Sequence, residues 1–159
     1  MHSLWRGEVI SDSGQASIPS PGESVRVMIG GTADKAVERT VRWAEGWTAG
    51  GAGPEQAAEF ARRVREAWKQ SGRKGDPRIV ALTYFALGPS AEQGVRSYLG
   101  DYHAFLGEWV DMIIQSAPTT YEAVKESASK SEEAGIDELI FDPTIADLDQ
   151  IDRLAEAVL

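Results

Sequence analysis

The residues best placed to do chemistry are Gly30-Gly31-Thr32, which stand where an apolar run gives way to a helical pattern. Backbone N–H groups converge at such a turn, the dipole of the following helix is positive there, and glycine leaves room for a phosphate. The Thr32 hydroxyl can cap the helix or contact the same anion. The pattern also describes a tight turn in which any side chain would clash, so the residues alone leave both interpretations open.

Other kinds of active site find little support in the residues. The glycine turn matches neither the dinucleotide-binding fingerprint nor the P-loop, and the serine nucleophile elbow is absent. His103 has no second histidine or spaced carboxylate to form a metal or relay set, so a packed structural role is favoured. We therefore predict no metal site, and the sequence identifies no catalytic residue.

The elements that must position the turn alternate between strands and helices. Residues 25–29 read as a strand, followed by a short strand at Trp47, a long one over residues 78–87, and a last one over residues 138–141 that is stopped by Asp142-Pro143. Helical patterns separate them, which predicts a parallel sheet with helical crossovers. Such a sheet is either half of a (β/α)₈ barrel or doubly wound.

The helices carry recognisable starts and apolar faces. Pro54 begins a helix that runs to about Gln70, and a long helical region is expected from residue 90 to about residue 115. Within it, Gly94, Gly100 and Gly107 suggest a break or close packing. Three capping pairs are predicted, namely Ser90 with Gln93, Thr119 with Glu122, and Asp147 with Gln150. The buried face of the last helix is predicted to comprise Leu148, Ile151, Leu154, Ala155 and Val158.

Composition excludes several classes of protein. The 159 residues carry 16 Lys+Arg against 25 Asp+Glu, and a net charge of −9 argues against nucleic-acid binding. The apolar runs are too short to span a membrane, and the first residues lack the apolar core of a secretory signal. The absence of cysteine fits a reducing compartment, so we expect a cytoplasmic protein.

Five segments together resemble the C-terminal half of the bacterial luciferase-like flavin-dependent monooxygenases. In chain order they are Leu4-Trp5-Arg6-Gly7-Glu8, Val27-Met28-Ile29-Gly30-Gly31, Ala44-Glu45-Gly46-Trp47, Gly135-Ile136-Asp137-Glu138-Leu139-Ile140 and Ile151-Asp152-Arg153-Leu154-Ala155. The resemblance implies an α/β fold, the last four βα units of a TIM-type barrel. It also implies that FMN or a deazaflavin coenzyme binds at the carboxyl ends of the strands. By resemblance, the cofactor-binding residues are Gly30, Gly31, Thr32, Gly46 and Trp47.

The resemblance covers residues 1–159 as a single partial barrel domain, of which residues 1–24 are largely loop. A whole barrel of this kind takes about 250 residues, so the first four strands lie outside the pattern. Glu45 also departs from the aspartate that is usual before Gly-Trp. No catalytic residue is carried over, because the family positions that contact the flavin ring and the substrate lie largely in the absent half.

Two functions follow from the resemblance. The first is the C-terminal half of a flavin- or deazaflavin-dependent oxidoreductase or monooxygenase, which acts on a small molecule once an N-terminal half completes it. The isolated chain should then bind flavin weakly or not at all. The alternative is a free-standing half-barrel, non-enzymatic or merely phosphate-binding, that associates with itself. Because an unpaired strand edge promotes association, oligomers are expected in either case.

Overall fold

A four-stranded parallel sheet forms the centre of the computed structural model, which describes residues 2–9, 12, 14–15, 25–50 and 53–159. The strands follow the chain order across the sheet: β1 (Met28–Gly30), β2 (Gly46–Gly50), β3 (Arg78–Phe85) and β4 (Glu138–Pro143). Each neighbouring pair is parallel, in the registers Ile29 to Trp47, Trp47 to Ile79 and Ala81 to Leu139. The predicted parallel α/β architecture is therefore confirmed.

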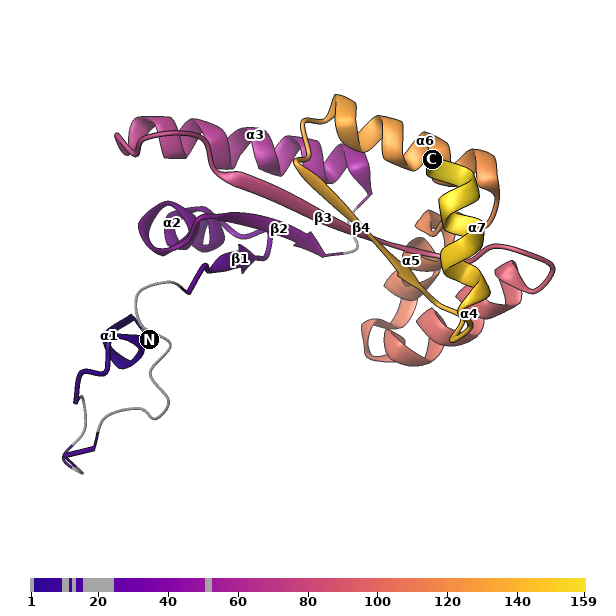
Figure 1. Ribbon diagram of the computed structural model, residues 1–159, viewed down its shortest axis with the longest axis horizontal. Helices are drawn as coiled ribbons and strands as arrows, with labels where there is room; N and C mark the ends of the chain where they lie inside the picture. Colours follow the sequence, from indigo (N-terminus) through magenta and orange to yellow (C-terminus); the bar gives the residue numbers. More distant parts are fainter. Residues whose placement is uncertain (1, 10–11, 13, 16–24, 51–52) are drawn as a thin grey trace.

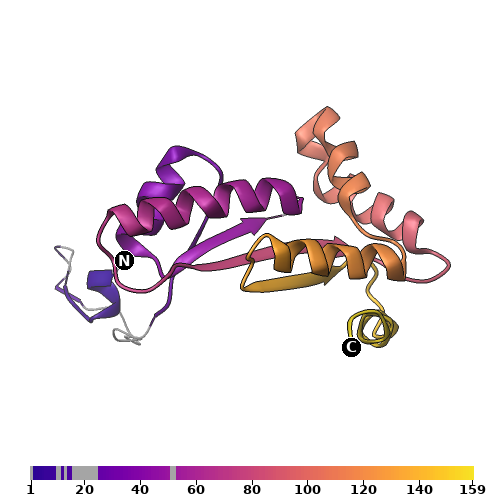
Figure 2. The same ribbon diagram turned by 90° about the horizontal axis from the view of Figure 1, so that it is seen from above.

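Helices connect the strands (Figure 1). Before the sheet lies α1 (His2–Trp5); the helices that follow are α2 (Asp34–Trp43), α3 (Pro54–Gln70), α4 (Ala91–Tyr102), a 3₁₀ segment η1 (Ala104–Trp109), α5 (Val110–Ser116), α6 (Tyr121–Glu133) and α7 (Asp149–Val158). Figure 1 shows α4 and α5 gathered beyond the arrowheads of the strands, and in Figure 2 α7 is seen end-on. The segment from α4 to α5 thus lies at the carboxyl ends of the strands.

One face of the sheet is packed against helices. Trp47 and Ile79, paired across β2 and β3, are 1% and 0% exposed and join Phe60 and Val64 of α3 in one apolar cluster. The Trp47 and Phe60 rings lie 4.7 Å apart. Because side chains alternate along a strand, the neighbouring positions point to the other face. There Ile140 is 43% exposed, so the described helices leave part of the second face uncovered.

Three strand boundaries differ from the prediction. Residues 25–27 precede β1 rather than form part of it, and the sheet contains β3 only as far as Phe85. The prediction that Asp142-Pro143 stops the last strand is wrong, because these residues pair with Tyr84 and Phe85. Proline is tolerated there because β4 is an edge strand, where a missing N–H breaks no ladder bond on the open side.

The helical region predicted from residue 90 to about 115 is broken. Gly107 has φ 58° and ψ −127°, a conformation open to glycine alone, and it separates α4 from α5.

The capping residues differ from those predicted at α4 and α6. Ser90 makes no side-chain cap bond, and at α6 Thr120 rather than Thr119 is the cap, its hydroxyl accepting the N–H of Ala123.

The face that the last helix turns inward overlaps only in part with the one predicted, since Leu154 packs against a core cluster as expected. Gln150 and Ala157 are its buried residues, whereas Leu148 and Ile151 are 80% and 61% exposed. Gln150 does not cap the helix by returning to Asp147 with its side chain; its amide bonds the backbone of Leu87 instead. At the other end of the chain, α1 lies within the predicted loop of residues 1–24, and residues 10–11, 13 and 16–24 lie outside the described part.

Candidate functional site

The glycine turn stands at the carboxyl end of β1. Gly30 is the last, exposed residue of the strand, and Gly31 has φ +100°, a value that L side chains rarely adopt. Thr32 is exposed, and the cap position of α2 is occupied by Ala33, so the Thr32 hydroxyl does not cap the helix. Of its two predicted roles, contact to an anion therefore remains.

Trp47 supports this turn through a hydrogen bond. Its indole Nε1–H donates to the carbonyl oxygen of Gly31 at 2.9 Å, while the ring itself is 1% exposed in the core. In a trans peptide the C=O and the next N–H point in opposite directions, so the N–H of Thr32 points away from the Trp47 ring. Trp47 thus lies against the predicted site, but as a buried support rather than as a cover over a ligand.

Gly46 has a packing requirement of its own. It begins β2 opposite Met28, and a Cβ there would lie 1.8 Å from the carbonyl oxygen of Arg78 on β3. Only glycine therefore allows β2 and β3 to approach at this point. The structure places Gly46 two residues before the position opposite Gly30, so its direct contact to a cofactor stays a prediction.

A second pair of glycines lies beside the first turn and is not among the predicted site residues. Gly50 ends β2, and Gly53 precedes Pro54 at the start of α3. A Cβ on either glycine would meet nothing within 4 Å. Two adjacent parallel strands thus end in glycine and lead to helix N-termini. The repeated glycines before Pro54 were the available signal.

Charges around the first turn are largely paired. The carboxylate of Asp34, in the first turn of α2, accepts a hydrogen bond from the Arg63 guanidinium of α3. The ammonium of Lys35 is 2.6 Å from the Glu38 carboxylate. Arg63 offsets the negative charge that Asp34 brings to the helix N-terminus, so the turn is not closed to an anion.

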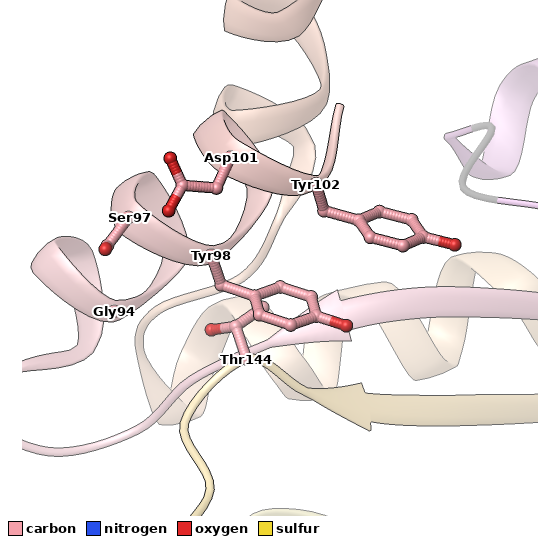
Figure 3. Close-up of a pocket in the computed structure, with 6 residues that line it drawn as sticks. All are labelled: Gly94, Ser97, Tyr98, Asp101, Tyr102 and Thr144. Atoms are coloured by element: carbon pink, nitrogen blue, oxygen red, sulfur yellow. The ribbon is translucent and has the colours of Figure 1, made fainter. Parts of the chain in front are cut away.

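An open cavity of about 600 Å³ lies farther along the same end of the sheet (Figure 3). Gly94, Ser97, Tyr98, Asp101 and Tyr102 of α4 line it together with Thr144 after β4. The two tyrosine rings are stacked, with centroids 5.9 Å apart and planes at 7°. Figure 3 shows them projecting from α4 to the same side. They offer a planar ligand an aromatic surface.

Tyr84 of β3 is partly buried and lies near Tyr98, which lines this cavity. Its ring is 6.3 Å from that of Tyr98, and burial, followed by the nearby Tyr102 and Asp142, raises the pKa of its hydroxyl. The phenol thus stays protonated and available as a donor under ordinary conditions. His103 packs edge-on against Tyr84 at 5.8 Å, with both ring nitrogens buried, in line with the structural role predicted for it.

The family model for luciferase-like monooxygenases matches residues 1–144. The chain belongs to this family. None of the curated proteins matches the luciferase-like chain, whereas solved structures do. Because the match spans most of the chain, the predicted resemblance is confirmed.

Among solved structures, an F420-dependent secondary alcohol dehydrogenase with a bound F420-acetone adduct superposes with a TM-score of 0.72 at 16% identity. The match covers 98% of the luciferase-like chain and 57% of the dehydrogenase. The coenzyme F420-dependent tetrahydromethanopterin reductase of Methanopyrus kandleri gives a TM-score of 0.66 at 13% identity. This match covers 99% of the luciferase-like chain and 59% of the reductase chain.

Riboflavin lyase, solved with modified FMN and riboflavin, gives a TM-score of 0.63 at 16% identity, covering 98% of this chain and 53% of the lyase. At such identities these likenesses show the fold alone, a TIM-type half-barrel. The luciferase-like chain spans a little over half the length of these structures. The first two of these neighbours are F420-dependent enzymes, and the lyase was solved with modified FMN.

Two further properties concern the described residues. Within them no group of three or more His, Asp or Glu side chains is arranged to hold a metal ion. None of the described helices of the luciferase-like chain combines the length and the apolar character needed to cross a bilayer.

Proposed function

We propose that this chain is the half of a luciferase-like flavin- or deazaflavin-dependent oxidoreductase that holds the phosphate of the cofactor. The observation that carries the proposal is that β1 and β2 both end in glycine at their carboxyl ends and that each strand is followed by a helix N-terminus. The carboxyl end of the strands is where TIM-type barrels bind their ligands. Two such strand ends side by side offer the N–H groups of two helix N-termini to one anion.

The residues present fit a phosphate. Space is open above Gly50 and Gly53, and a Cβ on Gly31 would meet only Ala36, at 3.7 Å. The hydrogen bond between Trp47 and Gly31 directs the N–H of Thr32 away from the Trp47 ring, and the Thr32 hydroxyl does not cap α2. We assign Gly30, Gly31 and Thr32 to the phosphate, with Trp47 holding the turn in place and Gly46 allowing β2, which carries Trp47, to pair closely with β3.

The cofactor, when bound, would supply the redox chemistry by accepting or donating a hydride or electrons. This chain's own residues bind and orient it. The stacked Tyr98 and Tyr102, with the protonated Tyr84 near them, form the surface at the same end of the sheet that suits a small organic substrate. Residues from a second set of strands are needed to complete the site, so the isolated chain should bind cofactor weakly and not turn over.

Titration of the chain with FMN and with riboflavin tests the phosphate assignment, because the two ligands differ only by the phosphate. The variant Thr32→Glu places a like charge at the turn on an exposed side chain. We expect it to weaken FMN binding by about tenfold or more while leaving riboflavin binding unchanged. F420, which carries a phosphate as well, should lose affinity in parallel.

The matched control is Ser129→Glu, which adds the same charge to an exposed position of α6. It should leave FMN binding at the wild-type level. Gly30→Ala gives an independent check of the phosphate assignment. Its Cβ would make only ordinary contacts of 3.6 Å to Thr48, so the strand stays intact. An unchanged preference for FMN over riboflavin in Thr32→Glu contradicts the phosphate assignment. Turnover by the isolated chain contradicts the proposed role as half of an enzyme.

A further inference from the structure

The last helix presents an apolar stripe to solvent. Leu148, Ile151 and Val158 are 80%, 61% and 44% exposed, whereas Gln150 and Ala157 are buried. We call these three residues the α7 stripe. Its position on the helix is turned away from α6: Glu156 accepts a hydrogen bond from the Tyr121 hydroxyl of α6 at 3.2 Å, and Ile151 lies about 140° round the helix from Glu156.

The sheet also has uncovered edges and an uncovered face within the described residues. Its order leaves β1 and β4 each paired on one side only, within the described residues. Ile140, on the face of β4 opposite to the helices, is 43% exposed, and Met28 and Leu82 on the same face of their strands are partly exposed. A strand edge and an apolar face of this kind favour association with another chain.

The helices beside the two edges of the sheet differ in charge. Beside the α7 stripe lie exposed Asp149 and Asp152, while α2, next to the other edge, exposes Arg39 and Arg42. Val37 and Val41 of α2 line the groove toward α3, and Arg39 lies about 160° round the helix from each of them. Arg39 therefore faces outward past β1. Neither Arg39 nor Asp152 forms an ion pair within the described part of the chain.

We propose that a second copy of this chain covers these surfaces, so that two half-barrels close into one eight-stranded barrel. Rotation by half a turn about an axis along the strands keeps all strands parallel. It sets β4 of each copy beside β1 of the other, and α7 beside α2. The acidic flank of α7 then meets the basic flank of α2, and this contact occurs twice.

The apolar part of the contact is complementary too. Trp43, 50% exposed at the end of α2, carries the Arg42 guanidinium 4.6 Å above its ring. The aliphatic stems of arginine cover apolar surface while their heads reach carboxylates. The α7 stripe can thus pack on Trp43 and the arginine stems while Asp152 pairs at the rim. Pairing between the sheets is short, because β1 has three residues, so the helices carry most of this interface.

Sedimentation velocity over a concentration series tests this closure, which is independent of the proposed cofactor site. Three proteins are compared: the full wild-type chain, an α2-reversed variant (Arg39→Glu with Arg42→Glu) and an α7-reversed variant (Asp149→Arg with Asp152→Arg). The wild type should dimerise. Each reversed variant places like charges at both contacts, so its dimer should weaken by about tenfold or more. Circular dichroism confirms that both variants are folded.

Mixing the two reversed variants gives the decisive result. In a mixed pair both contacts join opposite charges again, so a heterodimer should form from two proteins that are monomeric alone. A third variant, Ile151→Glu, changes an exposed stripe residue and should also weaken the dimer. A wild-type monomer at high concentration, open-ended oligomers, or a mixture that stays monomeric overturns the proposal. A monomer that instead forms a 1:1 complex with a polypeptide carrying the other half of a family barrel also overturns it.

Discussion

The side-chain amide of Gln150 forms two hydrogen bonds with the backbone of Leu87. Its Oε1 accepts the Leu87 N–H at 2.8 Å, and its Nε2 donates to the Leu87 carbonyl at 2.9 Å. Gln150 is 3% and Leu87 2% exposed, so water cannot replace these bonds. The segment after β3 has left the sheet at this point, and the amide acts in place of a neighbouring strand. It thereby ties α7 to the main chain that follows β3.

Replacing Gln150 by alanine should destabilise the protein strongly. Two buried backbone groups of Leu87 would lose their partners, and each such loss costs about 1–3 kcal/mol. We expect the free energy of unfolding, measured in urea, to fall by about 3 kcal/mol. Gln93→Ala, the same change at an exposed position of α4, should have little effect. Equal stability of the two variants would contradict this role.

Arg73 closes the carboxyl end of α2. Its Nη1 lies 3.0 Å from the Val41 carbonyl oxygen and 2.7 Å from that of Ala44, and its guanidinium stacks 3.6 Å above the Trp68 ring. Positive charge is favourable at this end of a helix. Arg73→Ala should cost about 1–2 kcal/mol and expose Trp68, shifting its fluorescence to longer wavelength. The neighbouring exposed Lys74→Ala should change neither quantity; a stable Arg73→Ala protein would rule out the cap.

Two glycines of α4 should respond oppositely to alanine. A Cβ on Gly94 would lie 2.4 Å from Cγ1 of Ile145, whereas one on Gly100 would meet nothing within 4 Å. Gly100→Ala should therefore raise stability by about 0.5–1 kcal/mol through the helix preference of alanine. Gly94→Ala should lose that gain and fall below the wild type, because Ile145 must move. Thermal unfolding of both proteins provides the comparison, and a shift of the same sign in both would refute the packing argument.

Tyr84 should make the protein sensitive to alkaline conditions. The pKa of its hydroxyl is raised in the folded state, first by burial, above the ordinary value of 10.0. The unfolded chain therefore loses this proton first, and the stabilisation present below pH 10.0 is lost as the pH rises through the raised pKa. In Tyr84→Phe the decline in urea stability above this pH should be smaller. A Tyr84→Phe protein that keeps the full wild-type decline would contradict this role of Tyr84.

The sequence was sufficient for the order and direction of the strands, because glycine, proline and apolar runs mark each element locally. It did not predict which side of α7 is buried. Leu148 and Ile151 form an ordinary amphipathic pattern, yet in the structure Gln150 faces inward, since its amide is needed by Leu87. The pattern shows that a face is apolar and not which surface it meets.

The candidate site was predictable to a similar degree. Gly30 and Gly31 could be located from a strand running into a helix. The support from Trp47 is a contact across 16 residues, which no local pattern contains. Gly46 appeared to be a cofactor residue by resemblance, whereas its closeness to Arg78 arises only once β2 and β3 pair. Contacts between strands decide which glycines serve a ligand and which serve the sheet.

The hydrogen bond from Trp47 to Gly31 also limits what the glycine turn can do. Its donor is held in the core against Phe60, so the turn cannot change shape without disturbing the packing of two aromatic rings. The orientation of the Thr32 amide is therefore fixed when the protein folds, before any ligand arrives. A preorganised amide of this kind loses little further freedom on association, which favours affinity even for an anion that makes few contacts.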